Sequence, residues 1–62
     1  MYCVSKQEGP GIWIKEHYFK TEFKAWVCAR TKSKQEECTY RVAHAFTNEV
    51  TSIVRFGEDF VA

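Results

Sequence analysis

The stretch that decides the fold covers residues 20–37 and reads KTEFKAWVCARTKSKQEE. It predicts one helix, because Ala, Lys, Gln and Glu dominate it and no Gly or Pro interrupts it. Thr21 is suited to the N-cap, and Glu22 places a carboxylate in the first turn, where the helix dipole favours negative charge. On a helical wheel, one side of this helix collects the apolar and small residues, namely Ala25, Ala29, Ser33, Trp26, Phe23 and Val27.

The same stretch also supports a strand. Apolar residues at positions 23, 25, 27 and 29 alternate with the residues between them, as a half-buried strand requires. The run is longer than a typical strand, and its composition favours a helix. An all-β small barrel, with residues 23–31 as a strand, is therefore the alternative fold.

Two strands are expected before the helix. Residues 1–6 and 12–19 alternate in polarity or are rich in aromatic and β-branched residues, and residues 7–11 (QEGPG) form the strongest turn signal in the chain. A turn of that length pairs Lys6 with Ile12 and Val4 with Ile14.

Two more strands are expected after the helix, over residues 38–46 and 50–56, joined by a three-residue loop at 47–49. That loop places Arg41 opposite Arg55, and Gly57 would end the second strand. Residues 58–62 are expected to form a short tail, with Phe60 folded back.

The element order is then ββαββ, which predicts an α+β fold: a small antiparallel β-sheet with one helix packed on one face, as a single domain over residues 1–62. His44 would lie at the edge of the core. The side of the sheet under the helix is expected to hold Val4, Ile12, Ile14, Tyr40, Val42, Phe46, Val54 and Phe56.

One helix covers only one side of such a sheet. The opposite side would carry an apolar centre ringed by basic residues, a composition typical of protein-binding hot spots. An exposed apolar patch of this kind indicates a partner. The predicted partner-binding residues are Trp13, Lys15, His17, Arg41, Ile53 and Arg55, and the other residues expected on this side are Cys3, Ser5, Ala43, Ala45 and Thr51.

No pattern of catalytic or metal-binding residues is present, so the sequence predicts neither an enzyme nor a cofactor. The candidate metal ligands lack the spacing of zinc sites; they are Cys3, His17, Cys28, Cys38 and His44. A Cys38–His44 nucleophilic pair would have nothing to orient its base.

Composition narrows the class further. The chain is 45% hydrophobic and 27% charged with a net charge of +1, which is typical of a globular domain and unlike a nucleic-acid polyelectrolyte. No apolar run has the length to span a membrane. Three cysteines without CxxC spacing predict a reduced, cytoplasmic protein, although a Cys28–Cys38 disulfide is an open alternative.

Single-stranded nucleic acid is the second candidate partner. The expected helix is locally basic, and the uncovered sheet face combines Trp13 with Lys15, Arg41 and Arg55, the mixture of stacking and phosphate-binding groups that single strands prefer. A second copy of the chain is a third candidate, because a homodimer would bury the same face.

The chain also resembles a family on short motifs between residues 19 and 54. The motifs are Thr21-x-x-x-Ala25-Trp26-x-x-Ala29, Tyr40-Arg41-Val42 and Thr47-Asn48-Glu49-Val50. They look like those of short ββαββ domains of unknown function in bacteria and their phages. The resemblance implies a small cytosolic protein, such as a phage-encoded inhibitor or regulator that docks onto a host protein. It supplies no catalytic residues.

Overall fold

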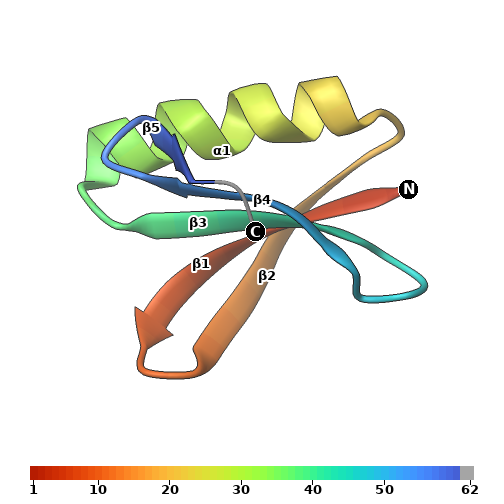
Figure 1. The fold of residues 1–62 in the computed structure, drawn as a ribbon, viewed down its shortest axis with the longest axis horizontal. Coiled ribbons are helices and arrows are strands. Elements are labelled where there is room, and N and C mark those ends of the chain that lie inside the picture. Colours follow the sequence, from red (N-terminus) through yellow and green to blue (C-terminus); the bar gives the residue numbers. More distant parts are fainter. Residues whose placement is uncertain (61–62) are drawn as a thin grey trace.

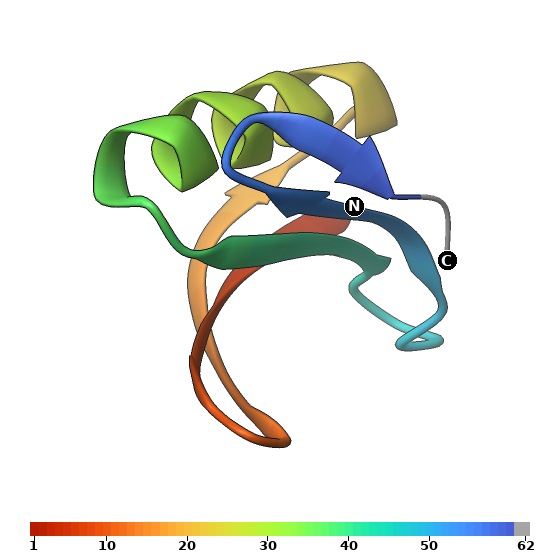
Figure 2. The ribbon, with the colours of Figure 1, turned by 60° about the vertical axis from the view of Figure 1, so that its left-hand side comes forward.

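The computed structural model describes residues 1–60 of the 62-residue chain, and within that range everything except the side chain of Phe60. The elements are β1 (Tyr2–Gly9), β2 (Ile12–Phe19), α1 (Glu22–Glu36), β3 (Thr39–His44), β4 (Val50–Arg55) and β5 (Glu58–Phe60). All strand pairs are antiparallel, in the order β2-β1-β3-β4-β5. Helix α1 lies across one face of the sheet (Figures 1 and 2).

The ββαββ arrangement with one helix on a small antiparallel sheet is confirmed. Strand β1 occupies the centre between β2 and β3, which run parallel to each other on its two sides. Helix α1 connects β2 to β3 and passes over β1, so these elements form a split β-α-β unit. The alternative with residues 23–31 as a strand is wrong, because these residues lie inside α1.

Local hydrogen bonds cap both ends of α1. The backbone N–H of Lys24 donates to the Thr21 hydroxyl oxygen at 3.3 Å, so Thr21 is the N-cap as expected. At the other end Glu37 has a left-handed backbone with φ 53°, and its N–H donates to the Ser33 carbonyl oxygen. This conformation closes the helix and turns the chain into β3.

The tail prediction is wrong, because residues 58–60 form a fifth strand. Phe56 and Gly57 both have positive φ, 51° and 81°. Two such residues in a row make the turn that joins the strands of a tight hairpin, so the chain folds back and β5 pairs with β4. The prediction that Phe60 folds back concerns a side chain outside the described part of the structure, as do residues 61–62.

The first hairpin has a shorter turn than expected. Pro10 and Gly11 alone form it, with φ 71° at Gly11, a position that favours glycine. Two register shifts interrupt the β1–β2 pairing, and Lys6 therefore faces Ile14. Ile12 and Ile14 lie on an edge strand beyond the reach of the helix, so both are exposed and their assignment to the core is wrong.

The second hairpin has a longer loop than expected. The loop spans residues 45–49, where the His44 carbonyl oxygen accepts from the N–H of Asn48 at 2.8 Å. The β3–β4 register is displaced by two residues, which pairs Tyr40 with Val54. Phe46 falls in the loop and Phe56 in the next turn. They are 80% and 58% exposed, so neither belongs to the core.

The core is a thin layer between α1 and the central strands. Ala25 and Ala29 on successive turns of α1 are fully buried, as are four sheet residues, Val4, Tyr40, Val42 and Val54. The small helix residues let the helix backbone approach the sheet closely. Phe23 and Val27 are instead exposed, which corrects their placement on the buried side of the helix.

Ser33 connects the end of α1 to the β4–β5 turn. Its hydroxyl is fully buried, donates to the Arg30 carbonyl oxygen at 3.0 Å and accepts from the Gly57 N–H at 2.9 Å. Its own carbonyl oxygen accepts from the Cys38 N–H at 3.3 Å. One residue therefore holds together the helix end, the entry to β3 and the last hairpin.

Replacing Ser33 with Ala should lower the free energy of unfolding by about 1–2 kcal/mol, because the Gly57 N–H loses its partner in a region shielded from water. Urea unfolding followed by circular dichroism measures the change. Thr31→Ala, which removes an exposed hydroxyl from the same helix, is the control. Equal stabilities of the two variants would contradict the role assigned to Ser33.

Replacing Phe56 with Asn should raise the melting temperature. The left-handed backbone at this position is unfavourable for Phe and much less so for Asn, and Asn-Gly is the preferred sequence for a two-residue hairpin turn. The exposed Phe ring has little buried surface to lose. Phe46→Asn, which also removes an exposed ring, is the control; a lower melting temperature for Phe56→Asn alone would refute this reading of the turn.

Candidate interaction surface

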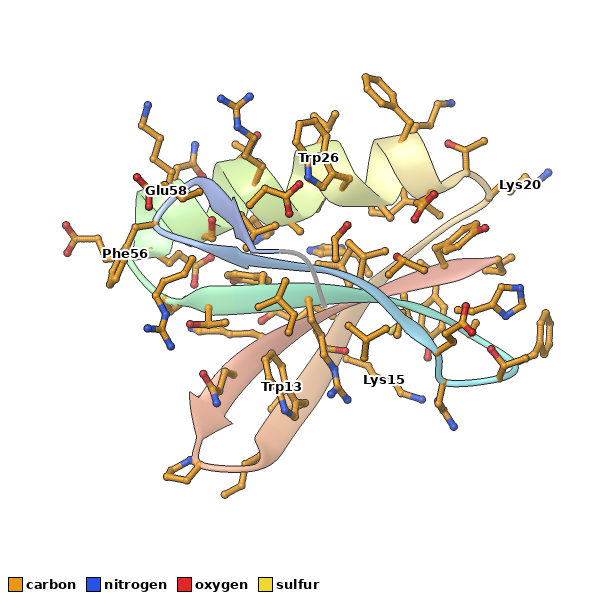
Figure 3. All side chains as sticks on the ribbon, in the orientation of Figure 1. Trp13, Lys15, Lys20, Trp26, Phe56 and Glu58 are labelled. Carbon is orange, nitrogen blue, oxygen red and sulfur yellow. The ribbon has the colours of Figure 1, made fainter. Side chains whose placement is uncertain are left out.

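The face of the sheet remote from α1 carries two neighbouring rows of predicted site residues. Directly opposed residues lie on the same face of a sheet. The first row runs across four strands as Lys15, Ser5, Arg41 and Ile53. The second contains the pairs Trp13–Gln7 and Thr39–Arg55. Figure 3 shows Trp13 and Lys15 on the side of the sheet away from α1.

Arg41 and Trp13 form the centre of this surface. The Arg41 guanidinium carbon lies 4.4 Å from the centroid of the Trp13 ring, a cation–π contact that joins β3 to β2 across β1. Both side chains are half-buried. The Arg41 Nε is shielded from solvent and has no hydrogen-bond partner in the described part of the chain.

The floor of the surface is made of small side chains from the two central strands. Cys3, Ser5 and Ala43 are buried although no helix lies over them. Ser5 sits between Lys15 and Arg41 in the first row, so the long side chains on either side cover it. Small side chains therefore lie at the centre of this side of the sheet and are covered by the larger ones around them. We call this helix-free side of the sheet, with Trp13, Lys15, Arg41, Ile53 and Arg55, the basic face.

Arg55 lies at one end of the basic face, on β4. Its Nε donates to the Thr39 hydroxyl at 3.1 Å, which fixes the guanidinium direction. The predicted opposition of Arg41 and Arg55 is wrong: Arg41 faces Ile53, because the long loop displaces the register by two. Next to Arg55 is an open cavity of about 550 Å³, where the β1–β2 hairpin diverges from β3 (Figure 1). Its lining residues are Gln7, Gly9, Pro10, Glu37, Cys38, Thr39, Arg55 and Phe56.

His17 does not belong to this surface. It lies opposite Val4, whose side chain is in the core under the helix, so His17 is on the helix side of the edge strand. Its ring is 6.4 Å from that of Phe19, which packs against the same core. The cause is a bulge at Glu16, which inverts the alternation of β2. The same bulge places Tyr18 opposite Cys3, and thus on the side of the basic face.

The surface is positively charged. Lys15, Arg41 and Arg55 take part in no ion pair among residues 1–60. The carboxylate in these rows is that of Glu58, which faces Arg55 in the β4–β5 register. Three cations on one side of the sheet, one of them stacked on the Trp13 indole, favour an acidic group on whatever binds there.

The ion pairs of the described chain lie on the helix side. Glu36 accepts from Lys6 at 3.0 Å and from Lys32 at 3.4 Å, which connects α1 to β1. The hydrogen bond with Lys6 is the main reason why the pKa of Glu36 is lowered and that of Lys6 raised. These residues stabilise the packing of the helix and leave no free charge for a ligand.

The buried phenol of Tyr40 is close to Glu36 and donates a hydrogen bond to Glu16 Oε1 at 3.3 Å. Burial raises the pKa of Tyr40 far above its ordinary value of 10.0, and the carboxylates of Glu36 and Glu16 raise it further. The phenol is therefore a neutral hydrogen-bond donor in the folded protein.

The cysteines show no sign of activation. Cys3, Cys28 and Cys38 are free thiols, so the Cys28–Cys38 disulfide is not formed. Burial raises the pKa of both Cys28 and Cys38, which keeps them protonated and poorly nucleophilic. Cys38 and His44 lie at opposite ends of β3. Over the described range, no three His, Cys, Asp or Glu residues converge as metal ligands would.

The sequence reading missed a second exposed group of residues, on α1. We call Phe23, Trp26, Val27 and Arg30 the helix ridge. The sequence does contain a signal for this exposed surface. The apolar residues of α1 occupy more than half of the helical wheel, which is wider than one sheet face can cover.

The chain matches no known protein-family model, no curated protein and no solved structure. The resemblance to short ββαββ domains therefore stays a prediction. No helix in residues 1–60 has both the length and the apolar character needed to cross a membrane.

The stability of the protein should fall as the pH rises above about 10. Because the folded-state pKa of Tyr40 is raised, its contribution is complete below the unfolded-state pKa of about 10 and is lost progressively above it. Urea unfolding at pH 8, 10 and 11 should show a smaller decline for Tyr40→Phe than for the wild-type chain. An identical decline in both would contradict this assignment, and Tyr18→Phe, which removes an exposed phenol, is the control.

Proposed function

We propose that this protein is a small non-enzymatic binding module that docks onto an acidic surface of another protein through the helix-free sheet face. The stacked pair of Trp13 and Arg41 carries the proposal. Trp and Arg are the residues most enriched in binding hot spots, and here each holds the other in place before binding. Lys15 and Arg55 lie on the same face and supply electrostatic guidance. Ile53 lies opposite Arg41 and supplies apolar contact.

The stacking of Arg41 on Trp13 favours a protein over single-stranded nucleic acid as the partner of the basic face. Stacking of a base requires an open aromatic face, and the Arg41 guanidinium already covers one face of the half-buried Trp13 ring. The surface offers only three cations, in a chain with a net charge of +1, so the counterion-release contribution to nucleic-acid binding would be small.

The charge of the basic face also disfavours a homodimer through this face. A two-fold interface brings the same patch of each copy together. Lys15, Arg41 and Arg55 would then face a second set of the same cations, which Glu58 opposite Arg55 and Glu37 in the adjacent cavity offset only in part. An acidic partner of different sequence removes this repulsion.

A binding module without catalytic groups acts most simply by occupying a surface that its partner needs. Together with the resemblance to phage and bacterial ββαββ domains, this supports a role as a cytoplasmic inhibitor or regulator, directed at a host protein if the chain is phage-encoded. The three free thiols are consistent with a reducing compartment.

The test compares two charge-neutralising variants. Immobilised wild-type protein captures partners from a lysate, and each purified partner is then titrated against Arg41→Gln and Lys20→Gln. Arg41→Gln should weaken binding about tenfold, or about 1.4 kcal/mol, whereas Lys20→Gln, the same loss of positive charge at an exposed lysine before α1, should leave it within about twofold.

Higher salt should weaken the same complex. Equal affinities of the two variants would refute the proposed face. Retention of the chain on a 25-nucleotide thymidine oligomer at low salt, lost in Arg41→Gln, would favour nucleic acid instead.

A further inference from the structure

The helix ridge presents apolar surface to solvent on the opposite layer of the molecule. Phe23 is 70% exposed and Val27 41% exposed, and they lie one turn apart on α1. Residues four apart on a helix are neighbours, so their side chains form one continuous patch. The helix core residues Ala25 and Ala29 lie on the other side of the same helix.

Trp26 gives the ridge a fixed shape. Its ring lies 6.1 Å from the Phe23 ring and 5.6 Å from the Arg30 guanidinium carbon. It also packs partly against the core, which anchors it. Trp26, which is held in this way, loses less side-chain entropy on binding than a freely exposed indole would. Figure 3 shows Trp26 on α1, on the opposite side of the sheet from Trp13.

A notch lies beside this row. A cavity of about 300 Å³ is lined by Glu22, Phe23, Trp26 and Ser52, where the first turns of α1 pass over β4. Its volume suits one bulky apolar side chain. A concave notch fits a side chain projecting from a protein better than it fits a flat lipid surface, and the Glu22 carboxylate in its lining would repel a lipid phosphate.

The charges around the ridge indicate an acidic partner. Lys24, Arg30 and Lys34 are exposed on α1, and none of them takes part in an ion pair among the described residues. Glu22 is the acidic residue of the notch. Apolar contact through the ridge, with cations on its borders, is complementary to an amphipathic helix that carries Glu or Asp beside its apolar stripe.

We infer that the helix ridge is a second docking site, which binds an acidic amphipathic helix of a partner protein and receives one bulky apolar side chain in the notch. This inference does not rest on the proposed function of the sheet face. The two sites lie on opposite layers, so both can be occupied at once and the chain can bridge two proteins.

The test selects binders from a library of helical peptides whose exposed positions are randomised. Enriched peptides should carry acidic residues beside Leu, Ile or Phe. In amide NMR spectra they should shift residues 22–34 and Ser52, and leave Lys15 and Arg41 unmoved. Phe23→Ala should weaken them at least tenfold, whereas Arg55→Gln, on the other layer, should leave affinity within about twofold.

Phe23→Ala removes a mostly exposed ring, so the variant should fold; its urea unfolding curve checks this. If Phe23→Ala is too unstable to interpret, Val27→Ser is used instead, and it should also weaken peptide binding at least tenfold. Failure to enrich acidic peptides, or enriched peptides that shift the Trp13 face, would overturn the inference and leave the proposed function intact.

Two further measurements exclude other occupants. In a Trp13→Phe variant, the emission of Trp26 alone reports on the ridge. A blue shift with phosphatidylserine vesicles and none with the selected peptides would overturn the inference in favour of a membrane surface. A concentration-dependent dimer in sedimentation that Phe23→Ala abolishes would overturn it in favour of a second copy of the chain.

Discussion

The close approach of α1 to the sheet is the constraint on which the structure depends. Ala25, Ala29 and Ser33 face the sheet, and none of them has a side chain long enough to separate the two layers. The Tyr40 ring and three valines fill the space that this leaves. A core this thin has no room for further aromatic rings, so most of them lie at its margins or on the surface.

The polar contacts around this core hold the layers in register. The Lys6–Glu36 pair joins α1 to β1, and the Ser33 hydroxyl joins the helix end to the β4–β5 turn. The Tyr40 phenol reaches across the core to Glu16 on the edge strand. Each contact connects elements that are far apart in sequence, which matters in a 62-residue chain where the apolar core alone is small.

The exclusion of large side chains from the core accounts for both proposed surfaces. On one layer, Trp13 is held by Arg41 above a floor of small residues. On the other, Trp26 is held between Phe23 and Arg30 beside a notch. In both places an indole is partly buried and a guanidinium lies over it, which restricts the indole before any partner binds. The two proposed surfaces therefore have similar chemistry and lie on opposite layers of the molecule.

The sequence by itself determined the helix, its Thr21 cap, the ββαββ order and the placement of Trp13, Lys15, Arg41, Ile53 and Arg55 on strands, because capping and hydrophobic periodicity are local properties. The strand register was decided only in the tertiary structure. A bulge at Glu16 reversed the side of His17, and two added loop residues moved Arg41 from Arg55 to Ile53. The outward position of Phe23 was also decided by the tertiary structure. A helical wheel shows that the apolar arc of α1 is too wide for one sheet face, but it does not show which part of the arc the sheet covers. Register and coverage depend on contacts between distant segments, and no local pattern encodes them.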